Sequence, residues 1–180
     1  NTVVDACLKY ALVAEEKSRM LDELELERGS YVLLTLHRAE NVDRREVLGE
    51  IMAAILELSK LVPIVYPVHP RTRKRPQEFG MWKEVEAALK ATNPLGYFDF
   101  LALLKNCLFV MTDSGGVQEE AVTLKIPCLT LRNNTERPET VEVGANVVVG
   151  TSKERILKVA KELLEREELL ESMRAKVCLL

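Results

Sequence analysis

The chain has 180 residues, of which 47% are hydrophobic and 29% charged, and its formal net charge is −3. This is an ordinary globular composition, and it excludes disordered and fibrous classes. The slight acidic excess argues against a nucleic-acid partner. No apolar stretch reaches the roughly 20 residues of a membrane span, and no signal peptide opens the chain. We therefore expect a cytoplasmic protein that binds neither nucleic acid nor membrane.

The cysteines and histidines limit the redox and metal chemistry. Cys7, Cys107, Cys128 and Cys178 lie far apart, without the Cys-x-x-Cys spacing of zinc or redox sites. We therefore predict reduced, buried thiols. Two histidines are too few for a metal site built mainly of imidazole, so no metal is expected.

In chain order, the sequence predicts an amphipathic helix over residues 2–28 that ends at Gly29, and then alternating strands and helices. Five apolar runs without polar alternation predict strands buried on both faces, at residues 31–36, 62–68, 107–112, 126–131 and 146–149. Pro63 and Pro67 mark the second run as an edge strand or as one that begins after Pro63. Helical spacing predicts helices at residues 45–61 with Asp43 as cap, 81–91, 99–105, 117–125, and 153–176 after a cap at Thr151 and Ser152.

This alternation predicts a Rossmann-like three-layer α/β/α domain with a mainly parallel sheet. In such sheets, ligands bind beyond the carboxyl ends of the strands. Unusual polar segments follow four of the predicted strands, and both histidines lie in them: residues 37–41, 69–72, 113–116 and 132–139. We expect these segments to face one crevice.

Ser114, Gly115 and Gly116 join a predicted strand to a predicted helix. The N–H groups and the dipole of a helix N-terminus hold phosphate, and Ser114 adds a hydroxyl. Glu120, about one turn further on, can accept hydrogen bonds from sugar hydroxyls. The segment matches neither a Walker P-loop nor the dinucleotide fingerprint, which weakens ATPase and NAD readings. The alternative is a tight turn in which Ser114 only caps the helix.

Arg137 and Phe100 each allow two interpretations. A guanidinium opposite a helix N-terminus would clamp a diphosphate from the other side. Alternatively, Arg137 lies on a surface loop and pairs with Glu136 or Glu139, which stabilises little. The ring of Phe100 can stack on a base, or it packs in the core.

The two histidines follow predicted strands directly. An imidazole near phosphate can donate a hydrogen bond or move a proton, which makes His37 a candidate catalytic residue. The same argument applies more weakly to His69. Glu40 and Asn41 are expected to order the loop after His37.

Taken together, the motifs resemble the non-hydrolysing UDP-N-acetylglucosamine 2-epimerases. The resemblance lies in residues 35–41 (TLHRAEN), 68–72 (VHPRT), 112–121 (TDSGGVQEEA) and 135–139 (TERPE). It covers essentially the whole chain but about half of a family member, in line with a chain that opens at Asn1 rather than Met. It implies one half of a glycosyltransferase-B-like fold, with residues 1–29 as the inter-domain crossing segment and amphipathic helix, and residues 30–180 as the C-terminal UDP-binding domain.

The resemblance also implies an activity. The family interconverts UDP-N-acetylglucosamine and UDP-N-acetylmannosamine by eliminating UDP and adding it back, with neither metal nor NAD, so no cofactor is expected. The implied partners are UDP and the UDP-N-acetylhexosamine, the N-terminal domain of the same protein, and a second copy in a homodimer. The implied site residues are His37 (catalytic), Ser114, Gly115 and Gly116 (phosphate), Glu120 (ribose), Arg137 (diphosphate), Leu95 and Phe100 (uracil), and Arg38 and His69 (a regulatory UDP-sugar site).

Two departures qualify that activity. The carboxylates expected to move the carbon-2 proton belong to the family's N-terminal domain, which this chain does not include. The family's Asn-Pro-Tyr-Gly-Asp-Gly stretch does not follow either, since residues 177–180 read VCLL. We therefore expect the isolated chain to bind UDP weakly and to lack epimerase activity. The alternatives are a UDP-sugar glycosyltransferase of the same fold, a hydrolysing epimerase that releases N-acetylmannosamine, and a non-catalytic nucleotide-binding module.

Overall fold

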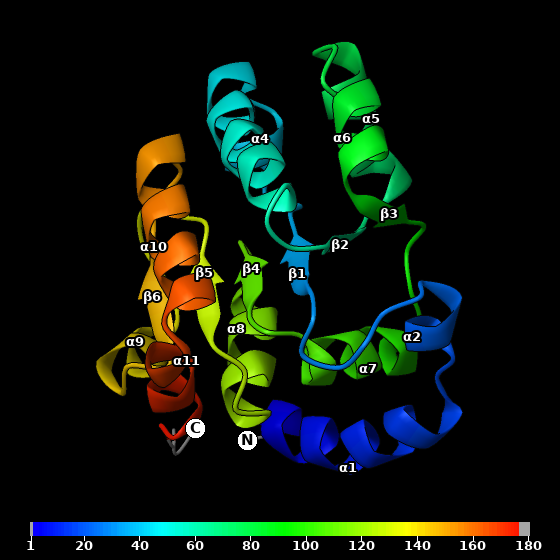
Figure 1. The fold of residues 1–180 in the computed structure, drawn as a ribbon, viewed down its shortest axis with the longest axis vertical. Coiled ribbons are helices and arrows are strands. Elements are labelled where there is room, and N and C mark those ends of the chain that lie inside the picture. Colours follow the sequence, from blue (N-terminus) through cyan, green and yellow to red (C-terminus); the bar gives the residue numbers. More distant parts are fainter. Residues whose placement is uncertain (1, 177–180) are drawn as a thin grey trace.

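The computed structural model describes residues 2–176 and is centred on a six-stranded sheet (Figure 1). The strand order is β3-β2-β1-β4-β5-β6 and every neighbouring pair is parallel. The strands are β1 (Val32–Thr35), β2 (Ile64–Pro67), β3 (Lys90–Thr92), β4 (Val110–Thr112), β5 (Cys128–Thr130) and β6 (Asn146–Val148). This is the order of a doubly wound Rossmann sheet, so the predicted fold class is confirmed.

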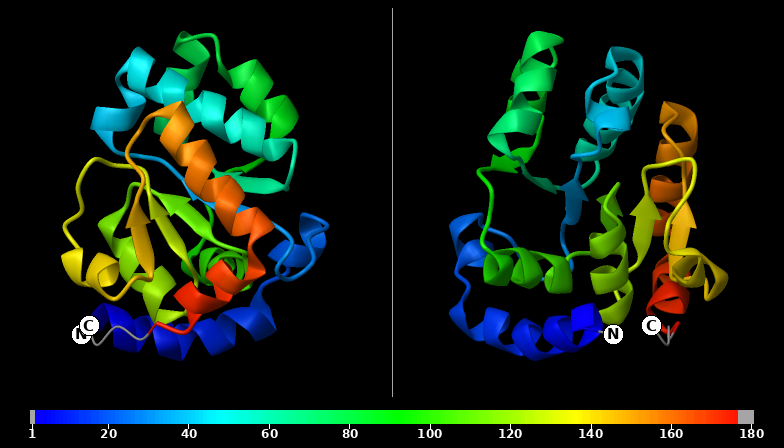
Figure 2. Two further views of the ribbon diagram at one scale, coloured as in Figure 1. Left: turned by 60° about the vertical axis from the view of Figure 1, so that its left-hand side comes forward. Right: turned by 180° about the vertical axis from the view of Figure 1, so that it is seen from behind.

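Helices cover both faces of the sheet (Figure 2). One face carries α4 (Arg45–Ser59), α5 (Pro70–Glu78), α6 (Trp82–Ala88), α10 (Lys153–Glu165) and α11 (Glu167–Arg174), and the other carries α1 (Thr2–Lys17), α2 (Met20–Glu23), α7 (Tyr97–Asn106) and α8 (Gly115–Thr123). In β1, Val32 and Leu34 join the first core cluster, whereas Leu33 joins the second. Successive strand side chains thus enter opposite cores, which explains why the strand sequences show no polar alternation.

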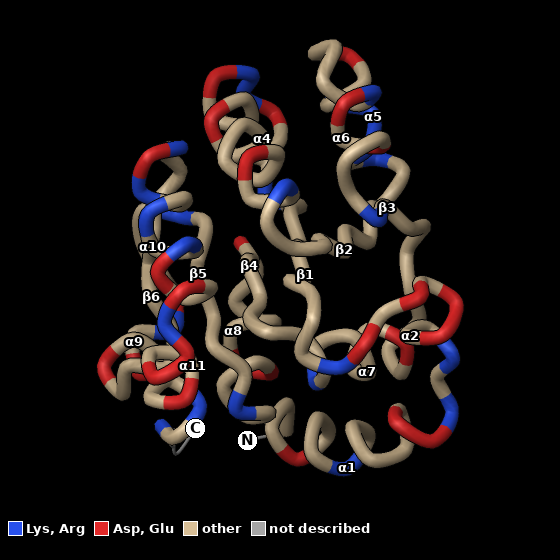
Figure 3. The backbone as a smooth tube through the Cα atoms, viewed as in Figure 1, with Lys and Arg blue, Asp and Glu red and all other residues tan. Residues whose placement is uncertain are grey.

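Charged residues lie mainly on the helices and loops (Figure 3). Two short helices complete the fold: α3 (Ala39–Val42) follows β1 at the carboxyl side of the sheet, and α9 (Pro138–Glu142) packs beside the start of β6. Among residues 2–176, no helix has the length and apolarity to cross a membrane.

Several predicted element boundaries were wrong. The first helix ends at Lys17, because the Ser18 hydroxyl bonds to the N–H of Met20 at 3.2 Å and so starts the separate α2. Gly29 (φ +70°) therefore lies in a turn before β1 rather than at a helix end. The last predicted helix is two helices, because Arg166 is extended (φ −121°, ψ 90°).

Helix starts also differ from the sequence prediction in places. Asp43 does not cap α4, because its carboxylate accepts a hydrogen bond from Arg75 Nε at 2.8 Å and Arg44 occupies the cap position. The predicted cap at Ser152 is confirmed, since its hydroxyl accepts a hydrogen bond from the N–H of Arg155. α8 begins at Gly115, two residues before the predicted start.

The strand β3 was not predicted, because residues 90–92 read KAT rather than an apolar run. β2 begins at Ile64, after Pro63. Because β3 pairs with β2, β2 is not an edge strand. The short helices α5 and α9 were also missed, since both begin with proline and carry many polar residues.

Within residues 2–176 the cysteines are free and buried, as predicted: Cys7, Cys107 and Cys128. Burial raises the pKa of Cys7 and of Cys128 to about 12, so both thiols are protonated at neutral pH. Cys178 lies outside the described residues, as does the departure at residues 177–180.

Candidate functional site at the carboxyl edge of the sheet

The segments after β1, β4 and β5 meet beyond the carboxyl ends of these neighbouring strands. Asp113 after β4 contacts the loop after β1. Asn41 in that loop donates to the carbonyl of Leu131 at 2.9 Å, at the end of β5. Side chains far apart in the sequence are therefore held together at the point where the strand order reverses, between β1 and β4.

The Asp113 carboxylate organises this junction from a fully buried position. It accepts hydrogen bonds from the backbone N–H groups of His37 (3.2 Å) and Arg38 (3.0 Å) and from Asn41 Nδ2 (3.2 Å). His37 Nδ1 lies 3.1 Å from Asp113 Oδ1. A buried carboxylate is tolerated only when it is surrounded by donors in this way, so Asp113 fixes the loop that carries His37.

His37 is oriented by this contact. Its Nδ1 faces Asp113, which directs Nε2 away from the carboxylate, and the imidazole is 52% exposed. A carboxylate facing Nδ1 fixes the ring orientation and selects the tautomer with its proton on Nδ1. Nε2 can therefore accept a proton or a hydrogen bond from a bound ligand, and it donates one only when the ring carries both protons.

Ser114 is the cap residue of α8, and its hydroxyl accepts a hydrogen bond from the N–H of Val117 at 3.4 Å. The capping role that sequence reasoning left as an alternative is thus present. Capping does not exclude phosphate binding, because the first turn of a helix offers several N–H donors and a positive dipole end. Gly115 lies against the loop after β5: a Cβ at this position would be in van der Waals contact, 3.7 Å from Glu136 Oε2 and 3.9 Å from Arg137 Cζ.

Arg137 therefore lies beside the first turn of α8. Its Nε lies 3.0 Å from Glu119 Oε1, and its Nη1 donates to the backbone carbonyl of Glu136 at 3.0 Å. Neither carboxylate named in the sequence alternative is its ion-pair partner, because the buried Glu119 of α8 takes that place. Glu119 holds the guanidinium at the helix start.

Glu120 lies on α8 facing the start of α7, where the Tyr97 hydroxyl donates to its Oε1 at 3.2 Å. Burial raises the pKa of Glu120 above its ordinary value. The carboxylate keeps acceptor capacity for a further donor, such as a sugar hydroxyl.

We expect Glu120→Gln to be at least as stable as the wild type at pH 7. Because the pKa of Glu120 is higher in the folded chain, folding favours the protonated carboxyl, and this contribution is lost as pH rises through the raised pKa. The advantage of the variant over the wild type should therefore shrink as pH is lowered through that value. Urea denaturation at several pH values measures it, with the exposed Glu142→Gln as control. A deficit of Glu120→Gln at pH 7 beyond that of the control would contradict the assignment.

Leu95 and Phe100, the predicted uracil pocket, flank the start of α7 and pack partly buried against the second core cluster. The core-packing alternative for Phe100 therefore describes part of its environment. More exposed aromatic rings lie nearby on the same helix, Tyr97 and Phe98, and both contact Tyr10 edge to face. Sequence reasoning did not assign these rings a role.

Arg38 and His69 contact different parts of the structure. Arg38 Nη2 lies 3.7 Å from Glu136 Oε2, toward α8. His69 caps α5, because its Nδ1 accepts a hydrogen bond from the N–H of Arg71 at 3.2 Å. His69 and His37 line one cleft of about 620 Å³, whose wall includes Arg71, Lys74 and Arg75. The cleft is rich in basic groups and can accept an anion.

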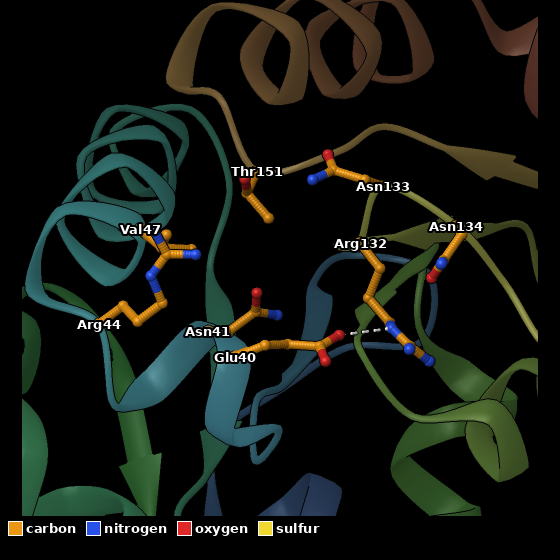
Figure 4. A pocket seen from close by; sticks show the side chains of 8 residues that line it. All are labelled: Glu40, Asn41, Arg44, Val47, Arg132, Asn133, Asn134 and Thr151. Carbon is orange, nitrogen blue, oxygen red and sulfur yellow. Dashed lines mark hydrogen bonds and ion pairs between the residues drawn. The ribbon is translucent and has the colours of Figure 1, made fainter.

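A second, smaller pocket of about 260 Å³ lies between α4 and the loops after β1, β5 and β6 (Figure 4). Glu40 extends toward Arg132 there and accepts a hydrogen bond from its Nε at 2.9 Å. This contact ties the loop after β1 to the loop that carries Arg137. Within residues 2–176, buried Nε atoms of Arg38 and Arg137 and Nη1 of Arg132 lack a hydrogen bond, because the close approach of Glu119 to Arg137 Nε is an ion pair without hydrogen-bond alignment.

Sequence reasoning missed the roles of Asp113, Arg132 and Tyr97. Asp113 had a signal, since an aspartate directly after a buried strand and before two glycines lies at the ligand edge of a parallel sheet. Arg132 had a similar signal, because it is the first charged residue after the carboxyl end of β5. In the described part of the chain no group of three or more His, Cys, Asp or Glu is placed to hold a metal ion.

A doubly wound sheet with a glycine turn, a helix N-terminus and arginines at its switch point defines a Rossmann-type nucleotide-binding domain. The family described as UDP-N-acetylglucosamine 2-epimerase matches residues 1–179. The chain belongs to that family.

Individual relatives agree with this assignment. The chain is 47% identical over 173 residues to the UDP-N-acetylglucosamine 2-epimerase of Methanocaldococcus jannaschii, covering 93% of this chain and 47% of that protein. The crystal structure of that archaeal epimerase with UDP-GlcNAc and UDP superposes with a TM-score of 0.84 at 46% identity, covering 92% of this chain and 47% of that one. The S. aureus MnaA–UDP structure superposes at 0.81 and 34% identity, covering 99% and 48%. The chain thus spans about half the length of these relatives.

Proposed function

We propose that this chain is the nucleotide-holding part of a UDP-N-acetylglucosamine 2-epimerase and that it binds UDP and a UDP-N-acetylhexosamine at the carboxyl edge of its sheet. In this proposal Ser114, Gly115 and Gly116 bind the phosphates, Arg137 clamps the diphosphate and Glu120 binds the ribose. Leu95 and Phe100 border the base. Residues 30–180 form the nucleotide domain, and residues 1–29 lead into it.

The observation that carries the proposal is the position of Arg137 beside Gly115 at the start of α8. A diphosphate there would receive backbone N–H groups from one side and a guanidinium from the other. Both kinds of donor stabilise the charge that develops on UDP when it leaves the sugar. The ion pair with Glu119 keeps Arg137 at this position.

His37 supplies the proton chemistry that this chain can offer. With Nδ1 held by Asp113, its Nε2 donates a hydrogen bond to a phosphoryl oxygen of the leaving UDP when the ring carries both protons. Elimination also requires a base that removes the carbon-2 proton of the sugar. We assign that base to the part of the protein that completes the active site, so epimerisation requires more than this chain.

The proposal is tested by calorimetric titration of the chain with UDP, with GDP and NAD as controls. We expect saturable UDP binding that neither control matches, and no conversion of UDP-N-acetylglucosamine by the chain alone. Equal binding of UDP and GDP by a folded chain would contradict the assigned base pocket. Conversion of UDP-N-acetylglucosamine by the chain alone would contradict our assignment of the carbon-2 base to another part of the protein. Joined to its N-terminal half, the protein should interconvert the two UDP-sugars rather than release free sugar or transfer it.

We also propose that the basic cleft lined by His37 and His69 takes a second anionic ligand of the same class. His69 and Arg38 would then serve a regulatory UDP-sugar, as the family resemblance implies. Arg38 faces the diphosphate cradle in this structure, so it would have to be shared between the two ligands. Loss of substrate activation in His69→Ala of the complete protein, with UDP binding to this chain unchanged, is the result expected.

A further inference from the structure

The Glu136 carboxylate lies among the cationic groups at the start of α8. Its Oε2 lies 3.7 Å from Arg38 Nη2 and its Oε1 lies 3.7 Å from Arg132 Nη1. The same Oε2 lies 3.7 Å from the place that a Cβ on Gly115 would occupy. A side-chain anion therefore occupies the region in which the proposed function places a diphosphate.

The arginine beneath it is firmly held, whereas the carboxylate is not. The Arg132 side chain is only 8% exposed, and Glu40 fixes its Nε at 2.9 Å. Its buried Nη1 has no hydrogen-bond partner within residues 2–176. The Glu136 side chain is 56% exposed, and its ion-pair distances exceed the 2.7–2.9 Å of a charge-assisted hydrogen bond.

A buried cation requires a counter-charge, because an uncompensated buried charge is strongly unfavourable. Glu40 provides the close counter-charge of Arg132 at Nε, and Glu136 adds a second carboxylate through long contacts to Arg132 and Arg38. A phosphate oxygen that reached Arg132 Nη1 would form the short, charge-assisted hydrogen bond that the guanidinium lacks in this structure. The carboxylate and the phosphate cannot both occupy this position, since like charges repel.

Resting on the proposed function, we propose that Glu136 is an internal counter-anion that the diphosphate displaces, and that Arg132 is a further diphosphate-binding residue. The wild-type affinity for UDP is then reduced by the competing carboxylate. Displacement frees Arg132 and Arg38 for the ligand, and return of Glu136 favours release.

The test compares two isosteric neutralisations that lie three residues apart. Glu136→Gln removes the competing charge, whereas Glu139→Gln removes an equal charge three residues away that pairs with neither Arg132 nor Arg38 in the described structure. We expect Glu136→Gln to bind UDP about three- to tenfold more tightly than the wild type, since the variant gives up two weak ion pairs. Glu139→Gln should stay within about twofold of the wild type. Equal affinities of the two variants for UDP would overturn the proposal.

A double-mutant cycle tests Arg132 itself. In an Arg132→Met background, the gain from Glu136→Gln should fall below about twofold, because the shared cation is gone. An undiminished gain would remove Arg132 from the site. Should Arg132→Met fail to fold, as judged by circular dichroism, Arg132→Lys serves instead, because an ammonium loses the bidentate geometry.

Inorganic pyrophosphate separates this inference from the proposed function. If the wild type binds UDP but Glu136→Gln binds it no more tightly, only the proposed counter-anion role of Glu136 is overturned. Pyrophosphate binding that tightens in Glu136→Gln, without any UDP binding, supports the counter-anion and contradicts the assigned uridine site. Failure of folded variants to bind either ligand overturns both.

Discussion

Replacement of Asp113 by alanine is expected to destabilise the chain by about 3–5 kcal/mol, the range seen when a buried charged partner is removed. The substitution leaves the part-buried N–H groups of His37 and Arg38 without their acceptor, and it removes one of the two hydrogen bonds of the buried Asn41 amide. Urea denaturation followed by the fluorescence of Trp82, a core residue, measures the loss. Asp113→Asn retains the shape and one acceptor oxygen, so its loss should be smaller.

Asp43→Ala is the matched control for this experiment. Asp43 is also an aspartate that pairs across elements, with Arg75 at 2.8 Å, but both side chains are nearly half exposed. An exposed ion pair contributes about 1 kcal/mol or less. A loss for Asp113→Ala no larger than that of Asp43→Ala would show that the buried carboxylate does not organise the loop.

Arg137→Ala is expected to lower the affinity for UDP about ten- to hundredfold. A hydrogen bond to a charged group contributes about 1.5–3 kcal/mol, and about 1.4 kcal/mol corresponds to a tenfold change in affinity. Calorimetric titration with UDP measures the change. The UDP affinity of Arg137→Lys should lie between those of the wild type and of Arg137→Ala, since an ammonium cannot bind two oxygens in parallel.

Arg28→Ala serves as the control for the lost positive charge. Arg28 precedes β1, at the opposite end of the strands, where it pairs with Glu15 at 3.0 Å. Its removal should leave UDP affinity unchanged within about twofold, because exposed charges more than about 10 Å apart are screened. If Arg137→Ala and Arg28→Ala weakened UDP binding equally, the loss would be explained by a general charge effect rather than by a contact of Arg137 with the diphosphate.

The main architecture could be predicted because burial on both faces leaves a clear mark in the sequence. The runs that became β1, β2, β4, β5 and β6 are mostly apolar, whereas Lys90 and Thr92 of the edge strand β3 are polar and only partly buried. The split of the C-terminal helix at Arg166 had no warning either, since arginine is a good helix former.

The site was predictable to the level of loops but not of side-chain contacts. The parallel order places the loops after β1, β4 and β5 together, so their convergence follows from topology alone. Which carboxylate an arginine meets depends on tertiary packing. Arg137 meets Glu119, eighteen positions earlier in the chain, rather than its neighbours in sequence. Asp113 likewise finds its donors about 75 residues away.

The pairing of β1 with β4 has a consequence for how the site arises during folding. The Thr35 and Thr112 hydroxyls hydrogen-bond across these strands, 77 positions apart, directly below the His37–Asp113 contact. Contacts of such high sequence separation form slowly, because a long loop must close before they stabilise anything. A nascent or partly folded chain that had built only the β1–α4–β2 unit would carry His37 without its buried carboxylate. The site at the carboxyl edge therefore forms late in folding, in the single step in which β1 pairs with β4.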